Sequence, residues 1–116
     1  GGGMETRDIG GVTVMAKIVS VDNPAALRDL ADKIKDKLGS GIVALGCESE
    51  GKALLLVGVT RDLLDRFHAG NLVKAAAGLV GGGGGGRPDM AQAGGTQPEH
   101  LAAALEKVCE LVGESG

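Results

Sequence analysis

The chain has 116 residues, and 15 Asp and Glu against 12 Lys and Arg give it a formal net charge of −3. This length suits one domain, and the acidic balance argues against a protein that holds nucleic acid by general phosphate attraction. Glycine is frequent, with 22 residues, whereas Phe67 is the one aromatic residue. The core must therefore be built from Val, Leu, Ile, Ala and Met, whose low bulk permits close backbone approach.

Residues 1–11 open with three glycines and are assigned to a linker or an expression remnant, ahead of a domain at 12–113. The N-terminus lacks the pattern of a signal peptide, and no apolar run approaches the ~18–20 residues of a membrane span. We therefore expect a cytoplasmic protein without membrane contact. Cys47 and Cys109 lie in apolar surroundings without CxxC spacing, which predicts buried, reduced thiols.

The first two elements in chain order are a strand and a helix. Residues 12–21, VTVMAKIVSV, are β-branched and apolar on both alternating sets, which predicts a covered strand. Asn23 is a suitable N-cap, and Pro24 fits the first helical position. Gly39 is placed to end this helix. Apolar residues recur between them at helical spacing: Leu27, Leu30, Ala31, Ile34 and Leu38.

Two apolar runs follow, at 41–48 and 52–60, and the turn residues Ser49-Glu50-Gly51 join them. This pattern predicts a β-hairpin. Thr60 is placed to cap a short helix that reaches Asp65 or Phe67.

In the last part of the chain, the spacing of apolar residues predicts two helices, and a glycine-rich loop at 81–95 separates them. The first restarts at Gly70-Asn71, and Gly78 inside it indicates close packing against a neighbour, since glycine costs ~1 kcal/mol there. The second has Pro98 in its first turn and ends at Gly113, with Thr96 or Gln97 as cap. The order predicts an α+β fold: a small mixed β-sheet packed with three to four helices in a single compact domain. A short strand inside 86–93 would complete the sheet.

No enzyme motif in the sequence has the flanking elements or partner residues that its chemistry requires. The run GGGGGG matches G-x-G-x-x-G trivially, but it leaves a helix where the nucleotide-binding motif leaves a strand, and no Gly-Lys-Ser/Thr follows. His68 and His100 stand alone, without a nucleophile or metal-ligand spacing nearby. We expect no catalytic centre and no metal site in these residues.

The stretch GGGGGGRPDMAQAGG, residues 81–95, is the candidate site. Consecutive backbone N–H groups without side chains can donate hydrogen bonds to anionic or carbonyl oxygens, and they allow a flat base to approach. Arg87 offers a fork of donors, and Asp89 and Gln92 can bond a ligand. The alternative is a glycine-rich turn that lets the last helix fold back, with Asp89 as a cap. The residues themselves leave both interpretations open.

Three segments carry a resemblance: LGSGIVALG, LVKAAAGLVGGGGGGRPDMAQAGG and the closing helix. From about Val12 to Val112 the chain resembles the globular C-terminal domain of bacterial-type alanyl-tRNA synthetases, the synthetase form of the DHH-associated domain. The run 84–95 is its most specific part. In related DHH phosphoesterases a histidine typically stands where Arg87 stands here.

The resemblance implies a tRNA-binding accessory module rather than an enzyme. The parent is a ligase that uses ATP, Mg and, in its editing domain, Zn; no cofactor is implied for these residues. The implied partners are tRNA(Ala), held at its outer corner, and the other domains of the synthetase, with a homodimer left open. The alternative is a structural or oligomerisation tail without RNA contact. The implied RNA-binding residues are Gly84, Gly85, Gly86, Arg87, Asp89, Gln92, Gly94, Gly95 and Lys74.

Overall fold

A computed structural model describes residues 6–114. Its helices are α1 (Pro24–Leu38), α2 (Ala69–Ala77) and α3 (Leu101–Glu114), with short 3₁₀ turns at Arg61–Leu63, Gly78–Val80 and Pro98–His100. Its strands are β1 (Arg7–Ile9), β2 (Val12–Ile18), β3 (Ile42–Ser49), β4 (Lys52–Val59), β5 (Gly82–Gly86) and β6 (Met90–Gly95).

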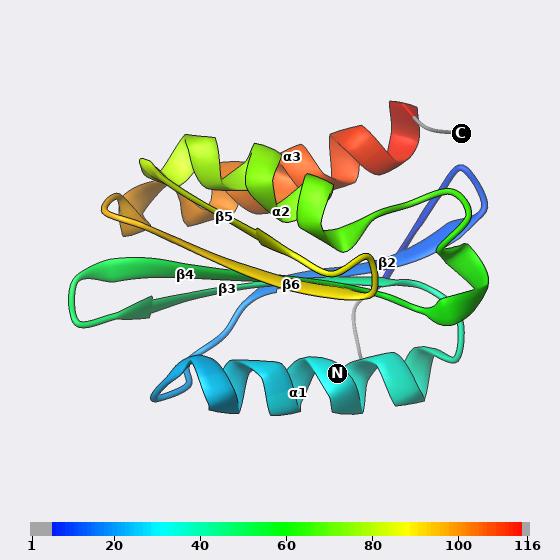
Figure 1. Ribbon diagram of the computed structural model, residues 1–116, viewed down its shortest axis with the longest axis horizontal. Coiled ribbons are helices and arrows are strands. Elements are labelled where there is room, and N and C mark those ends of the chain that lie inside the picture. The colour runs from blue at the N-terminus through cyan, green and yellow to red at the C-terminus, as the bar shows by residue number, and fades with distance from the viewer. Residues whose placement is uncertain (1–5, 115–116) are drawn as a thin grey trace.

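The strands form one six-stranded sheet in the order β1-β2-β3-β4-β6-β5. β2 and β3 are parallel because α1 connects them, and every other neighbouring pair is antiparallel. Helix α1 covers one face of the sheet, whereas α2 and α3 lie side by side on the other (Figure 1). The predicted α+β class, with one mixed sheet and three helices, is confirmed. No helix in the described part of the chain is long and apolar enough to cross a membrane.

Helix α1 forms as its sequence predicts. The Asn23 Oδ1 accepts a hydrogen bond from the Ala26 N–H at 2.8 Å, and Pro24 occupies the first turn. Gly39 follows with φ 72°, and its N–H donates to the Lys35 carbonyl. These caps fix where the helix begins and ends, whereas the spacing of its apolar residues decides which stripe meets the sheet. The residues on that stripe are fully or nearly fully buried: Leu27, Ala31 and Ile34.

The β3–β4 hairpin is also confirmed, with a turn of two residues. Ser49 pairs with Lys52, so only Glu50 and Gly51 lie between the strands. Their φ values of 53° and 78° both lie in the left-handed region, as a type I′ turn requires. Cys47 and Cys109 are buried free thiols, as predicted.

The glycine-rich segment 81–95 is not a loop, which corrects the sequence prediction. Gly82–Gly86 form β5 and Met90–Gly95 form β6, and the two strands make a hairpin on β4. The expected short strand inside 86–93 corresponds to β6, shifted towards the C-terminus. A second correction concerns the assigned linker at 1–11, because Arg7–Ile9 form β1 and pair with β2. Residues 1–5 lie outside the described residues.

Helix α2 differs from its prediction at both ends. It begins at Ala69, because the His68 Nδ1 accepts the Asn71 N–H at 3.2 Å and caps the helix. It ends at Ala77, and a Cβ on Gly78 would meet nothing within 4 Å, so the expected close packing at Gly78 is wrong. Gly70 is the position of close approach instead: a Cβ there would lie 2.6 Å from the Gly86 carbonyl oxygen.

Helix α3 forms as predicted, but its ends also differ. It continues through Gly113 to Glu114, and Gln97 makes no side-chain capping bond. The predicted stripe packs against the sheet and α2, since Leu101, Leu105, Val108 and Val112 are all buried. The same packing holds α2 against the hairpin of β5 and β6, which we call the glycine hairpin.

Candidate nucleic-acid interface

The register of the β5–β6 hairpin separates its glycines into two faces. Gly84 pairs with Ala93 and Gly85 with Gln92, and paired residues point to the same side of a sheet. The side of Gly84 and Ala93 faces α2, where Ala93 and Ala91 join the main core. The opposite side, on which α1 lies, carries Gly83, Gly85, Gln92 and Gly94. We call these four residues the open face.

The glycines that face α2 are required by the fold. A Cβ on Gly82 would lie 1.8 Å from the Gly94 carbonyl oxygen, and one on Gly84 would lie 2.5 Å from the Ala93 Cα. Gly86 has φ 150°, which L side chains rarely adopt. Side chains here would displace backbone atoms of β6, so glycine is the residue that lets the two strands approach.

The glycines of the open face have no such explanation. A Cβ on Gly83 or Gly85 would meet nothing within 4 Å, and neither residue has a positive φ. A Cβ on Gly94 would make only an ordinary contact, 3.5 Å from the Ala53 carbonyl oxygen. The fold would accept alanine at all three positions. Folding therefore does not account for these three glycines, of which Gly83 is exposed and Gly85 and Gly94 are half-buried.

Gln92 is the long side chain of the open face, and two hydrogen bonds hold it. Its Nε2 donates to the Pro24 carbonyl oxygen at 3.2 Å, and its Oε1 accepts from the Arg28 guanidinium at 2.6 Å. Arg28 is an exposed residue of α1. The structure brings it beside the hairpin, a proximity that no local pattern could reveal because 64 residues separate it from Gln92.

Arg87 stands at the turn of the hairpin. Its Nε lies 3.4 Å from the Asp89 Oδ1, and both side chains remain substantially exposed, at 75% and 43%. A hollow of about 390 Å³ lies beside it, lined by Arg28, Arg87, Gln92 and the edge of β5. An exposed ion pair of this kind is weak, so the Arg87 guanidinium can exchange its carboxylate partner for another anion.

The remaining residues of the predicted site lie elsewhere. Gly84 and Gly86 point towards α2, and a Cβ on Gly95 would lie 2.2 Å from the Val80 carbonyl oxygen. Lys74 is on the exposed side of α2, which covers the opposite face of the sheet (Figure 1). The structure thus brings Gly85, Gln92 and Gly94 together on the open face, with Arg87 and Asp89 at its end.

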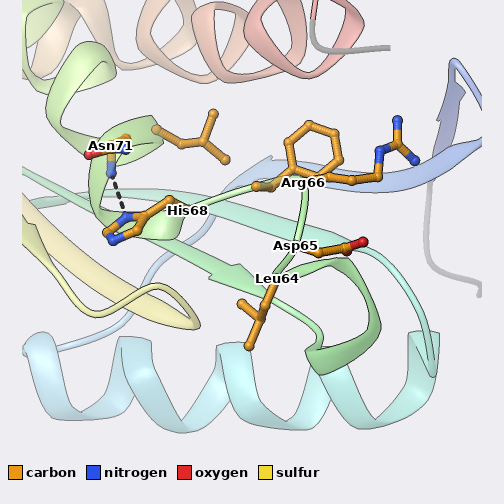
Figure 2. Close-up of a pocket in the computed structure, with 7 residues that line it drawn as sticks. Leu64, Asp65, Arg66, His68 and Asn71 are labelled. Carbon is orange, nitrogen blue, oxygen red and sulfur yellow. Dashed lines mark hydrogen bonds between the residues drawn. The ribbon is translucent and has the colours of Figure 1, made fainter.

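A second hollow, of about 310 Å³, lies where β4 leads into α2 (Figure 2). Two of its polar residues already have a structural role, because the His68 Nδ1 caps α2 by accepting the Asn71 N–H. Arg66 lies over the Phe67 ring, 5.1 Å from its centroid, and that ring is 4% exposed. Phe67 is therefore a core residue and offers no stacking surface. Among residues 6–114, no group of three His, Cys, Asp or Glu could hold a metal ion.

A carboxylate with hydroxyl neighbours joins two loops away from the hairpin. Ser40 and Thr60 both donate to Asp62, the latter at 2.6 Å, and these bonds lower the pKa of that carboxyl. Thr60 Oγ1 in turn accepts the Gly41 N–H at 2.9 Å. Burial raises the pKa of the Cys109 thiol, which favours the unreactive protonated form.

Comparison with known families agrees with this architecture. The sequence profile of the DHHA1 domain matches residues 11–114. The chain belongs to the DHHA1 domain family.

Relatives of this DHHA1 domain include two alanine–tRNA ligases. The chain is 61% identical over 110 residues to that of Desulfosudis oleivorans, covering 95% of this chain and 13% of the ligase. It is 63% identical over 105 residues to that of Anaeromyxobacter dehalogenans, covering 90% of this chain and 12% of the ligase. The DHHA1 domain therefore corresponds to a small part of each ligase.

The fold also matches the C-Ala domain from Aquifex aeolicus alanyl-tRNA synthetase, with a TM-score of 0.87 and 26% identity. The match covers 95% of this chain and 99% of that domain. The resemblance drawn from the sequence is confirmed, including that the relatives are ligases.

Proposed function

We propose that this DHHA1 domain is a tRNA-binding accessory module of a cytoplasmic alanine–tRNA ligase. In this proposal it holds tRNA(Ala) at its outer corner, while other domains carry the ATP- and metal-dependent chemistry of aminoacylation and editing. The observation that carries the proposal is the open face, where the fold tolerates side chains but the sequence has glycine at 83, 85 and 94. Glycines that folding does not require are explained by a ligand or another backbone that approaches them closely.

The chemistry of the open face suits RNA recognised by shape. Without Cβ atoms the peptide planes of β5 are accessible, and a base or ribose can lie directly on them. Gln92 adds an amide whose position is fixed, and Arg87 adds a guanidinium that fits phosphate. Because the chain is acidic overall, its RNA contact should be local and weak. Attachment to the rest of a ligase would raise the effective concentration and make a weak contact sufficient.

One observation favours a second function, that of an assembly tail without RNA contact. β5 is an edge strand, and edge strands present unpaired backbone groups to which another chain can add. Another domain of the ligase, or a second copy of this domain, could pair there. The two functions separate cleanly, because strand pairing uses the edge of β5 whereas RNA contact uses its open face.

The test compares Gly85→Val with Gly78→Val. Neither Cβ would meet an atom within 4 Å, so both variants should fold, as judged by far-UV circular dichroism. Gly85→Val should weaken binding of full-length tRNA(Ala) at low salt by at least tenfold, because the added side chain holds the RNA off the backbone. Gly78→Val, in the segment that follows α2, should bind like the parent chain.

Arg87→Ala removes a positive charge from the same site and should also weaken tRNA binding. If both hairpin variants bind tRNA as well as the parent does, RNA contact through the open face is refuted. A change in sedimentation behaviour without a change in tRNA affinity would support the assembly tail.

A further inference from the structure

Three of the four open-face residues, Gly83, Gln92 and Gly94, line the middle one of three neighbouring hollows. The hollow beside Arg87 adjoins this middle hollow of about 340 Å³, since Gln92 lines both. The middle hollow adjoins a third, of about 360 Å³, since Leu54 and Gly94 line both. We call these three adjoining hollows the trough. It runs along the hairpin from Arg87 at the turn to Lys52 at the start of β4.

The trough carries positive charge at both ends. Arg28 and Arg87 line one end and Lys52 lines the other. Lys52 lies two residues before Leu54, so both point to the same side of β4, and Leu54 pairs with Gly94 of the open face. No carboxylate lines any of the three hollows in the part of the chain that the structure describes, although the exposed Asp89 pairs with Arg87 beside one of them.

The distance between these ends sets the size of the ligand. Residues 81–86 run beside the trough, and at ~3.3 Å per residue their five steps span roughly 17 Å. Stacked nucleotides in one strand advance by ~3.4 Å each, so about five of them cover that length. A mononucleotide or trinucleotide can reach one end only.

We infer that the trough binds the sugar–phosphate backbone of RNA at both ends, with Lys52 as a second phosphate contact some five nucleotides from the Arg28–Arg87 end. This inference rests on the proposed function and adds to it a requirement for length. Short nucleotides lose one of the two contacts, so the trough favours an extended, structured RNA over free nucleotides. The bare middle part lets the intervening riboses and bases lie close to the sheet.

The experiment measures RNA affinity of the whole chain against salt for Lys52→Ala. Each phosphate contact contributes ~0.7–0.9 to the slope of log K against log salt, which is roughly five- to eightfold in affinity at 0.1 M salt. Lys52→Ala should lose this factor with tRNA(Ala) and lower the salt slope by that amount. Binding of a trinucleotide should be unchanged. Lys17→Ala is the matched control, because Lys17 lies on the same side of the sheet but in a different hollow, beside α1.

Three results would overturn the inference, and the first two leave the proposed function standing. In one, Lys52→Ala binds tRNA as Lys17→Ala does, although Gly85→Val still weakens tRNA binding. In the other, Lys52→Ala weakens the trinucleotide and tRNA equally, which removes the length requirement. Polyglutamate serves as a competitor: if it displaces tRNA as well as unlabelled tRNA does, the trough is a surface for acidic protein segments and the inference fails. If neither the parent chain nor Gly85→Val binds tRNA, the proposed function fails first.

Discussion

Two neighbouring glycines of β5 should respond in opposite ways to the same substitution. Gly84→Ala places its Cβ 2.5 Å from both the Cα and the Cβ of Ala93 and 2.6 Å from the Gln92 carbonyl oxygen. These atoms cannot rotate away, so β5 and β6 must move apart. Gly85→Ala, one residue later, places its Cβ in open space.

The magnitudes follow from these environments. Overpacking of this kind costs ~1–3 kcal/mol, so Gly84→Ala should lower the free energy of unfolding by about that much. Gly85→Ala adds no clash and restricts the unfolded chain, which stabilises by ~0.4–1 kcal/mol. The two variants should therefore differ by roughly 1.5–4 kcal/mol, although they make the same chemical change one residue apart.

Urea unfolding followed by far-UV circular dichroism measures this difference. With m near ~2 kcal/mol/M, the midpoints should lie about 1–2 M apart at unchanged m. Equal midpoints for Gly84→Ala and Gly85→Ala would refute the division of the hairpin into a packed face and an open face. The claim that glycine at 85 is not needed for folding would then fail as well.

Three further substitutions test the local structure. Gly70→Ala should destabilise by ~1–3 kcal/mol in thermal or urea unfolding, because its Cβ would lie 2.6 Å from the Gly86 carbonyl oxygen; an unchanged midpoint would contradict the close approach of α2 to β5. Asn23→Ala removes the cap of α1 and should cost ~1 kcal/mol by the same assay. Asp62 has a pKa below its unfolded value, so its contribution to stability is complete above about pH 4 and is lost as the pH falls through the folded pKa. Asp62→Ala should accordingly flatten the acid side of the stability–pH profile, and a profile parallel to that of the parent would show that its hydroxyl partners do not stabilise the carboxylate.

The parts of the fold that the sequence predicts are those specified by local signals. Helix α1 has an N-cap at Asn23, a proline in its first turn and a glycine after its last, and each acts within a few residues. The β3–β4 hairpin has two apolar runs and a turn glycine. The predicted start of α2 was wrong because a histidine, His68, provides the N-cap where no common capping residue stands.

The glycine hairpin could not be predicted in the same way. Glycine has low strand propensity and no side chain whose alternation would reveal a strand, so β5 depends on pairing with β6, which in turn pairs with β4. The pairing register of β5 with β6 alone decides which of its glycines lie on the side of α2 and which on the open face. Arg28 and Lys52 were missed for a related reason, since their proximity to the hairpin arises from tertiary packing and not from sequence spacing.

The most direct test of the central claim is a low-salt titration of this chain with full-length tRNA(Ala) beside an acceptor-stem minihelix that lacks the outer corner. The parent chain should prefer the full tRNA, and Gly85→Val should lose that preference while keeping the fold, with a midpoint of unfolding no lower than that of the parent. Equal binding of both RNAs by the parent chain, or an undiminished preference in Gly85→Val, would contradict corner recognition through the open face.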